Sequence, residues 1–309
     1  MSSLWAVTAF FNPAGFSSRL RNYRTFRRHL GVPLVAVELS FTGRFELDPD
    51  DADILVRITG SDVMWQKERL LNLGLAALPA DCDKVIWLDC DIVFGRDDWA
   101  AAVSEALDRH LLLQPFSHAR FMPPGWRPGD NAAAVDLRHP PAFLVARGSR
   151  PEAAAAFTEG SVVQMAYTPG LAWAARRELL DGRGVYDACV IGGGDGALMR
   201  AAFGLADLTG RLQRMSPARY EHYRAWAEPF RAALRGTEVG FVPGDVHHLW
   251  HGAIADRRYV DRHAAFSPFG FDPATDITID PGGAWRWSSP KTAMHAFVAD
   301  YFAGRREDD

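Results

Sequence analysis

Two carboxylates separated by one residue follow an apolar run in the sequence KVIWLDCDIVF. Asp89 and Asp91 come directly after residues 85–88, which have the length and character of a strand covered on both faces. Ligands bind outside the carboxyl ends of the strands in open α/β sheets. If the chain stays extended, both carboxylates project to the same side. The pair predicts a site for Mg²⁺ or Mn²⁺ with open positions for phosphate oxygens, and an enzyme that acts on a phosphorylated donor. The alternative is a turn with two solvated acids.

A group of histidines late in the chain offers further metal ligands. The segment GDVHHLWHG follows a predicted strand over residues 238–242 and contains His247, His248 and His251. In an extended segment His247 and His251 would share one side and His248 the other, although Gly252 permits a bend. Neutral imidazole is a common metal ligand, so one of these residues is expected to complete the sphere begun by the aspartates.

A third acid follows three glycines in the sequence IGGGDG. Glycines at 192–194 let the backbone approach a ligand closely, and Asp195 then stands exposed at the start of a helix that opens at about Ala197. The spacing is not that of a dinucleotide-binding fingerprint. The alternative is a flexible turn with Asp195 as the helix N-cap.

Several cations could bind phosphate groups. Arg19 and Arg21 lie in the first turn of a predicted helix that begins at Ser17 or Ser18 and runs to Leu30. A second predicted helix, from Ser61–Asp62 to about Leu78, carries three polar residues one element before the aspartate pair: Lys67, Arg69 and Asn72. Arg257 and Arg258 form another local cluster of the same kind.

Strands and helices alternate through the first part of the chain. Strands are predicted over residues 5–11, 32–39, 54–58, 85–88 and 111–116, with helices between most of them. This alternation indicates a mostly parallel sheet. Residues 117–150 are rich in proline and glycine, and we expect a loop beside the site or a surface excursion. Residues 266–305 predict a hairpin at 281–283 followed by a helix, and the charged tail from residue 305 is expected to fray.

The composition is that of an ordinary soluble protein of 309 residues, with 48% hydrophobic and 23% charged residues. A net charge of −4 provides no overall basic field for nucleic acid or anionic lipid. No apolar run approaches the ~20 residues that span a bilayer, and the N-terminus lacks the basic region of a signal peptide. The three cysteines show no CxxC spacing and are expected to be reduced thiols, which favours a cytoplasmic location.

Taken together, these motifs resemble the GT-A glycosyltransferases, and specifically a family-2-like bacterial and phage group. Residues 62–72 look like the nucleotide-side helix of that group, and Trp87-Leu88-Asp89-Cys90-Asp91 looks like its Asp-x-Asp metal motif. Residues 170–178 with Gly192-Gly193-Gly194-Asp195 are similar to the C-terminal half of β-galactosyltransferase-like enzymes, where an acidic turn carries the catalytic base. His248-Leu249-Trp250-His251-Gly252 is similar to the late histidine that completes the metal site. The turn departs from the family pattern, since Gly-Gly-Gly-Asp-Gly replaces a run richer in acids.

The resemblance covers about residues 5–260 and implies a Rossmann-like α/β fold of GT-A type, with a mostly parallel central sheet and helices on both faces. It implies one domain over residues 1–265, whose halves, 1–116 and 117–265, bind the nucleotide sugar and the acceptor, and an extension over 266–309. Mn²⁺ or Mg²⁺ would be bound by Asp89, Asp91, His248 and His251. The donor, most readily a UDP-sugar, would contact Arg19, Arg21, Lys67, Arg69, Asn72 and Asp89. The acceptor side would comprise Trp173, Gly193, Gly194 and Asp195.

The implied reaction is the transfer of a hexose-type sugar to an acceptor hydroxyl, with Asp195 as the base. A single base on the side away from the leaving group favours inversion at the anomeric carbon. The acceptor could be a glycan, a small molecule or a modified nucleobase. Two other functions compete with this one. A sugar-phosphate nucleotidyltransferase also combines an α/β sheet with acids and Mg²⁺, and the ten tryptophans would suit a non-catalytic protein that binds nucleotides or glycans.

Overall fold

The computed structural model describes residues 3–60, 62–131, 133–155, 167–259 and 261–308. Its centre is a seven-stranded sheet with the strand order β10-β6-β9-β4-β1-β2-β3. Neighbouring strands are parallel except at β9, which runs antiparallel to both β4 and β6. The strands are β1 (Ser3–Phe11), β2 (Leu34–Ser40), β3 (Ile54–Thr59), β4 (Cys82–Leu88), β6 (Leu112–Gln114), β9 (Ala172–Arg176) and β10 (Gly240–Phe241). The predicted mixed α/β fold with a mostly parallel sheet is confirmed.

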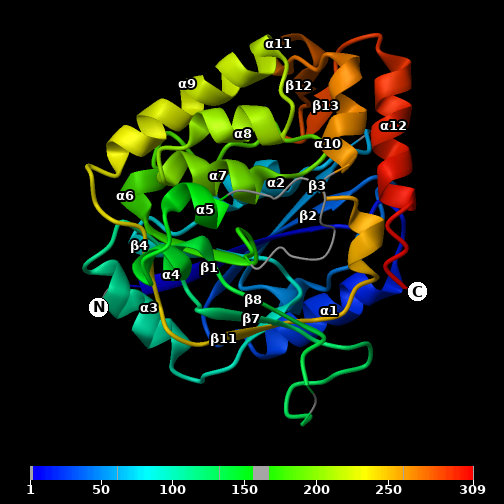
Figure 1. The fold of residues 1–309 in the computed structure, drawn as a ribbon. Coiled ribbons are helices and arrows are strands. Elements are labelled where there is room, and N and C mark those ends of the chain that lie inside the picture. The colour runs from blue at the N-terminus through cyan, green and yellow to red at the C-terminus, as the bar shows by residue number, and fades with distance from the viewer. Residues whose placement is uncertain (1–2, 61, 132, 156–166, 260, 309) are drawn as a thin grey trace.

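Helices cover both faces of this sheet (Figure 1). Because side chains alternate along a strand, β1 sends Ala6 and Phe10 to one face and Val7 and Phe11 to the other, where they enter two separate hydrophobic cores. The first core also contains residues of α1 (Ser17–Arg28) and α3 (Trp99–Leu107). The second contains residues of four helices: α2 (Lys67–Ala76), α7 (Gly194–Ala202), α9 (Pro217–Ala233) and α12 (Thr292–Ala303).

A second, four-stranded sheet has the order β5-β11-β7-β8 and lies below the main sheet in Figure 1. Its strands are β5 (Ile92–Phe94), β7 (His118–Phe121), β8 (Asp136–Arg138) and β11 (Asp245–His248). The region expected to be a loop, residues 117–150, therefore contains two strands and the helix α4 (Pro141–Ala146). This sheet brings β11 against β5, which directly follows the aspartate pair.

Further short helices and strands complete the fold. They are α5 (Pro151–Ala155), α6 (Arg177–Leu180), α8 (Ala206–Leu212), α10 (Asp261–Phe266), α11 (Pro273–Asp276), β12 (Ile277–Ile279) and β13 (Trp285–Trp287). The expected C-terminal hairpin is present, since β12 pairs with β13 in antiparallel register. Gln66, just before α2, donates from Nε2 to the Trp285 carbonyl and accepts from the Trp285 amide, at 2.7 and 3.0 Å. The hairpin is thereby fixed to the start of α2.

The C-terminal tail differs from expectation. Asp308 accepts hydrogen bonds from the backbone amides of Ser17 and Ser18, at 2.8 and 2.7 Å, so it caps the N-terminus of α1. Figure 1 shows the red C-terminal tail ending beside the blue helix α1, while the N-terminus lies on the opposite side of the molecule. The expectation of fraying was wrong for residues 305–308, because ion pairs and this cap hold them.

Among the residues described, we find no helix whose length and apolar character would allow it to cross a membrane.

Candidate active site

A pocket of about 760 Å³ opens at the carboxyl ends of β1 and β4. Phe11, at the end of β1, lines it together with Asp89 and Asp91 beyond the end of β4. This is the edge at which ligands bind in open α/β sheets. Asp195 and the His248–His251 segment line the same pocket, so the fold brings together the three acidic and histidine motifs found in the sequence.

The two aspartates separate inside the pocket. The chain turns at Cys90 and Asp91, between the end of β4 at Leu88 and the start of β5 at Ile92, so it does not stay extended there. Asp89 contacts Lys67, with Oδ1 2.5 Å from Nζ. Asp91 instead faces His248 and His251. The turn therefore gives the two carboxylates different partners.

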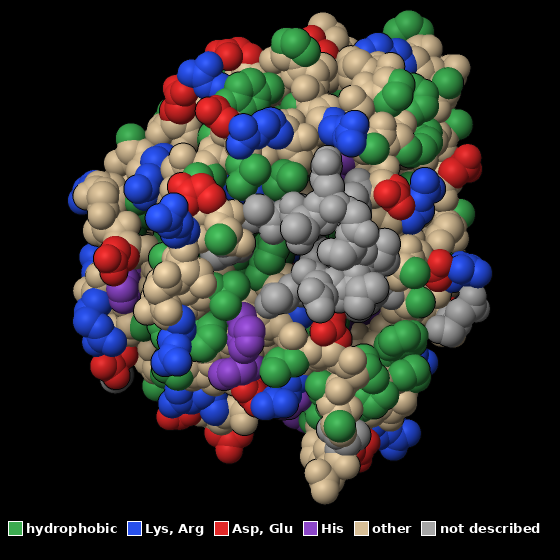
Figure 2. Space-filling view, in the orientation of Figure 1, with side chains coloured by type: hydrophobic (Ala, Val, Ile, Leu, Met, Phe, Trp, Pro, Cys, Tyr) green, Lys and Arg blue, Asp and Glu red, His purple; other side chains and the backbone are tan. Residues whose placement is uncertain are grey.

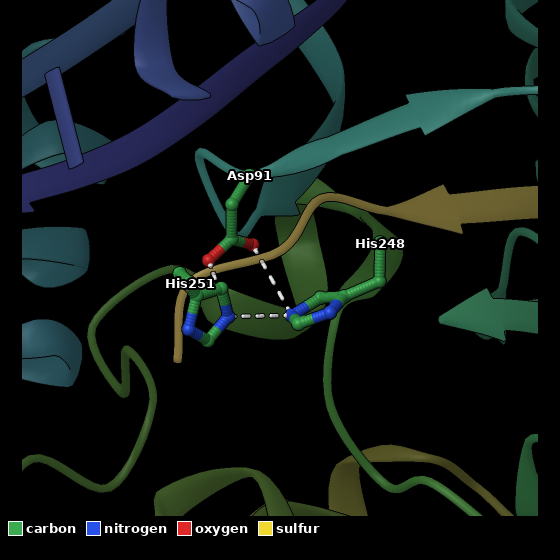
Figure 3. A group of neighbouring side chains, drawn as sticks. All are labelled: Asp91, His248 and His251. Atoms are coloured by element: carbon green, nitrogen blue, oxygen red, sulfur yellow. Dashed lines mark hydrogen bonds and ion pairs between the residues drawn. The ribbon is translucent and has the colours of Figure 1, made fainter. Parts of the chain in front are cut away.

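Asp91, His248 and His251 form a compact group (Figure 3). Their ligand atoms all lie within 4.8 Å of one another. The Asp91 oxygens lie 3.7 Å from His248 Nε2 and 3.1 Å from His251 Nε2, and the two Nε2 atoms are 2.8 Å apart. Figure 3 shows both imidazoles directing a nitrogen toward the carboxylate and toward each other. Carboxylate oxygen and imidazole nitrogen are a donor set that suits Mn²⁺ and related divalent cations.

Two further observations indicate that this group fits a cation. Asp91 Oδ1 is buried without a hydrogen-bond partner among the described residues, which is costly for a carboxylate oxygen. Burial lowers the pKa of His248 to about 4, an effect that Asp91 opposes and Arg257 reinforces, so the ring is neutral near pH 7. A neutral imidazole keeps the lone pair that a metal requires.

The histidines meet because the chain bends after β11. His248 is the last residue of that strand and lies opposite Ile92 in the antiparallel ladder. The Leu249 amide donates to the Asp91 carbonyl at 2.8 Å, which fixes the two segments together. Residues 249–251 lie outside the strand, and the chain bends at Gly252, whose φ is +92. His251 lies against His248 in this segment. His247 projects away and stacks on Trp126, so the pairing of His247 with His251 expected for an extended chain does not occur.

Lys67 joins two of the acids. Its Nζ lies 2.8 Å from Asp195 Oδ2 as well as 2.5 Å from Asp89 Oδ1. Burial opposes the charge on Lys67, but Asp195 and Asp89 outweigh it and raise its pKa well above the ordinary value. Burial, with Asp195 and Asp91 nearby, raises the pKa of Asp89 even though Lys67 opposes the shift. One ammonium group therefore serves several carboxylates, which leaves this end of the pocket favourable for a further cation.

The glycine-rich turn places Asp195 by close packing. Gly192 and Gly193 have φ values of +82 and +99, a left-handed conformation that glycine adopts without strain. A Cβ atom on Gly170 would lie 2.7 Å from Asp195 Oδ2, and one on Gly194 would lie 2.1 Å from Glu68 Oε1. Only hydrogen at these positions leaves room for the two carboxyl groups. Burial raises the pKa of Glu68 above its ordinary range.

Three arginines surround one buried glutamate beside the histidines. Arg19, Arg257 and Arg305 all line the pocket. Glu307, which is 1% exposed, lies 2.7 Å from Arg19, 2.7 Å from Arg305 and 3.6 Å from Arg257. Burial alone would raise the pKa of Glu307, but the three guanidinium groups outweigh it and lower that pKa to about 2. Three cations facing one anion leave positive charge available for a ligand.

Five predicted site residues, Gly194 among them, do not line the pocket. Arg21 is exposed on α1. Arg69 donates to the Gly283 carbonyl and lies 3.5 Å from Asp187, while Asn72 donates to Asp187 and to the Val185 carbonyl, so both hold structure together. Trp173 is fully buried in β9 and donates to the Pro169 carbonyl at 2.8 Å. Gly193 lines the pocket, and Gly194 packs against Glu68.

Other residues in or beside the pocket carried little sequence signal. Arg305 and Glu307 lie in a charged tail whose composition is typical of a solvated terminus. Arg262 and His263 lie in α10, which has no motif that could be read from spacing. Arg257 belongs to a pair of arginines that the sequence marks as a phosphate-binding candidate, but its position beside His251 depends on the fold. Arg257 Nη2 donates to the His251 carbonyl at 2.6 Å.

No protein-family model matches the chain, and no curated protein matches its sequence. Solved structures with a similar fold include Staphylococcus aureus TarS in complex with UDP, at 12% identity and a TM-score of 0.40, with 97% of this chain and 70% of that chain covered. Another is a variant of Drosophila β1,4-galactosyltransferase 7 in complex with manganese, UDP-Gal and xylobiose, at 11% identity and a TM-score of 0.33. There the match covers 78% of this chain and 65% of the other, slightly less than two thirds of its length.

A third similar structure is the 4-diphosphocytidyl-2C-methyl-D-erythritol synthase of Anaerococcus prevotii, at 10% identity and a TM-score of 0.33, with 79% of this chain and 89% of the other covered. The similar structures thus include a glycosyltransferase, the class of enzyme that the sequence resembles. All three structures share only a distant similarity of fold with this chain. Its function must therefore be argued from the side chains of the pocket.

Proposed function

We propose that this protein is a metal-dependent glycosyltransferase that moves a sugar from a nucleoside-diphosphate sugar, most readily a UDP-sugar, to an acceptor hydroxyl. One observation supports this proposal above the others. A single pocket contains a three-ligand group for a divalent cation, a cluster of arginines and an acid held by a lysine. These are the parts that departure of a diphosphate and activation of a hydroxyl require.

The leaving-group end of the pocket contains Asp91, His248 and His251, which would hold Mn²⁺ or Mg²⁺. The bound cation would stabilise the negative charge that develops on the departing diphosphate. Arg19 and Arg305 supply fixed positive charge beside this group, and their guanidinium planes suit phosphate oxygens. Lys67 adds an ammonium group next to Asp89, on the side where the sugar of the donor would lie.

The acceptor end of the pocket contains Asp195, at the start of α7. In the proposed reaction the acceptor oxygen attacks the anomeric carbon while Asp195 takes the hydroxyl proton. The bond from the anomeric carbon to the diphosphate oxygen breaks, and its electron pair leaves with the diphosphate. Lys67 orients the Asp195 carboxylate through its 2.8 Å contact. Attack from the side away from the diphosphate would invert the configuration at the anomeric carbon.

The test is release of nucleoside diphosphate from a panel of UDP-, GDP- and dTDP-sugars, with Mn²⁺ and with EDTA; a CMP-sugar, which can release only CMP, is included as a monophosphate comparison. We expect one donor class to give metal-dependent release and to raise the melting temperature through binding to the folded state. Asp195→Ala should keep that donor-dependent rise while losing transfer. Anomeric configuration of the product, determined by NMR, decides between inversion and retention.

Two outcomes would contradict the proposal and favour one of the two alternative functions. Formation of pyrophosphate from a nucleoside triphosphate and a sugar phosphate, with no diphosphate release from nucleotide sugars, would identify a nucleotidyltransferase. Binding of a nucleotide sugar with no turnover in Mn²⁺ across a range of acceptors would identify a binding protein. Loss of donor binding in Asp195→Ala would remove that residue from the role of base.

A further inference from the structure

A second group of cations lies beside the turn that carries Asp195. We call Arg200, Arg262 and His263 the cationic wall; all three line the pocket. Their side chains lie close to the glycines of the turn. A Cβ atom added to Gly192 would lie 3.2 Å from Arg262, and one added to Gly193 would lie 3.1 Å from His263. A Cβ atom added to Gly196 would lie 2.8 Å from Arg200. The wall therefore adjoins the acceptor end of the pocket.

The wall is buried, and two of its members, Arg262 and His263, are incompletely hydrogen-bonded. Arg262 and His263 are each 6% exposed, and Arg200 is 1% exposed. Arg262 Nη1 donates to the Tyr301 hydroxyl at 2.7 Å, but Arg262 Nε and His263 Nδ1 have no hydrogen-bond partner among the described residues. A buried polar atom without a partner is costly, by about 1–3 kcal/mol, and more for a charged group. The pocket is where a ligand could supply these partners.

The charge around the wall is unbalanced. Another buried arginine, Arg219, lies behind the wall and donates to Gln213 at 3.0 Å. Within the described part of the chain, no ion pair joins Arg262 to a carboxylate. Asp195 is already engaged by Lys67, and Asp261 is the other acid that lines the pocket near the wall. Glu307, which offsets the arginines beside the histidines, contacts Arg19, Arg257 and Arg305 instead.

This concentration of charge belongs to the interior of the protein. Figure 2 shows Lys and Arg side chains distributed over the surface with acidic side chains among them, as a net charge of −4 would suggest. Burying an arginine beside others is unfavourable unless an anion binds there. Burial, reinforced by Arg262, Arg219 and Arg200, lowers the pKa of His263 well below the ordinary value, so the ring is neutral and can donate one hydrogen bond.

We propose that the acceptor carries an anionic group, a phosphate or a carboxylate, which Arg262, Arg200 and His263 bind while its hydroxyl lies at Asp195. This inference rests on the proposed function and names the acceptor class of the same pocket. Arg262 would bind the anion through its guanidinium group, and His263 would add a neutral hydrogen bond. The anion would then fix the distance between the acceptor hydroxyl and the base.

The first test uses sulfate as the probe, with UDP and Mn²⁺ at saturating concentration so that the leaving-group end is filled. The melting temperature is measured as low-millimolar sulfate replaces chloride at constant ionic strength. We expect a saturable rise in the wild-type protein that is lost in Arg262→Gln. Arg109→Gln, at an exposed arginine just after α3 that pairs with Glu105, is the matched control and should keep the rise.

Because Arg262 is buried, its substitution could unfold the protein, and the UDP–Mn²⁺ shift of each variant serves as the check of its fold. Arg211 lines the pocket from an exposed position at the end of α8, so Arg211→Gln cannot create a buried defect and should weaken the sulfate rise. The inference is overturned if the wild-type protein shows no saturable rise, or if Arg262→Gln and Arg211→Gln both keep it unchanged.

The second test measures transfer from the active donor to glucose 6-phosphate, glucuronate and glucose. We expect kcat/KM at least about tenfold higher for one or both anionic acceptors than for glucose, with the advantage lost in Arg262→Gln through KM. The comparison of phosphate with carboxylate identifies the anion. Equal rates for charged and neutral acceptors would contradict the inference, while metal-dependent diphosphate release would leave the proposed function standing.

Discussion

Arg19 Nε lies 2.7 Å from Glu307 Oε2, although the two residues are 288 positions apart in the chain. Arg19 also donates from Nη1 to the Phe11 carbonyl at the end of β1. The last residues of the chain are thereby attached to the first strand and first helix, next to Asp91 and the histidines. The C-terminal tail is consequently part of the pocket wall.

Glu307→Gln should destabilise the protein at pH 7 by about 3 kcal/mol, because it leaves three buried guanidinium groups without their carboxylate. The pKa of Glu307 is lowered to about 2 in the folded state. A lowered carboxyl pKa contributes stability above the unfolded pKa of about 4, and this contribution is lost as the pH falls toward 2. Urea unfolding of wild type and variant between pH 7 and pH 2.5 measures the difference.

The difference in unfolding free energy between wild type and Glu307→Gln should narrow steadily below pH 4. Glu105→Gln, at an exposed glutamate on α3, is the control and should match the wild type at every pH. A constant difference between pH 7 and pH 2.5 would show that Glu307 contributes through packing and not through charge.

Asp91→Asn and His248→Ala should each weaken Mn²⁺ binding by at least about tenfold, since each removes one of three ligands. His247→Ala is a closely matched control, because His247 is the neighbour of His248 but stacks on Trp126 outside the group. Titration of free Mn²⁺ followed by electron paramagnetic resonance gives the affinities. Equal affinities for His247→Ala and His248→Ala would exclude this group as the metal site.

Gly170→Ala should reduce transfer by about tenfold or more while leaving Mn²⁺ affinity unchanged. The new Cβ would lie 2.7 Å from Asp195 Oδ2, so the carboxylate must swing away from its present position. Small displacements of a catalytic group have large effects on rate. Gly304→Ala is the control, because the nearest atom to its Cβ would be 3.4 Å away. Steady-state kinetics with the active donor measure the loss of transfer, and manganese titration measures the metal affinity. A normal transfer rate in Gly170→Ala would mean that transfer does not depend on the present position of the Asp195 carboxylate.

Glu68→Gln should change how stability depends on pH. Burial raises the pKa of Glu68, so its protonated form is the one that favours folding. The stability it provides is complete below the unfolded pKa of about 4 and is lost as the pH rises through the higher folded pKa. Between pH 5 and pH 8 the wild type should therefore lose on the order of 1–2 kcal/mol relative to Glu68→Gln. If the unfolding free energies of wild type and Glu68→Gln change in parallel between pH 5 and pH 8, Glu68 is already ionised at pH 5.

Much of the fold could be predicted because its signals are local. The apolar run at 85–88 forms a buried strand, β4, in the middle of the sheet, and the alternation of strands and helices predicts parallel pairing. A short strand followed by a helix is predicted over residues 169–180 and is present as β9 and α6, but the antiparallel direction of β9 was not evident, since strand direction depends on how the chain returns across the sheet. The sequence pattern predicted that α2 begins at Ser61–Asp62, but this helix begins at Lys67, so the predicted start was too early. Ser61 itself lies outside the described residues.

The sequence by itself determined which side chains were available: an aspartate pair after a buried strand, a glycine-rich turn with an acid, and a cluster of histidines. Only the tertiary structure decided their partners. A turn at Cys90 and Asp91 sent Asp89 to Lys67 and Asp91 to the histidines, and a bend after β11 selected His248 and His251 over His247. The tertiary structure likewise decided that Glu307 lies among three arginines. Residue spacing fixes side-chain direction only while the backbone stays regular, and these contacts form where it turns or between segments far apart in the chain.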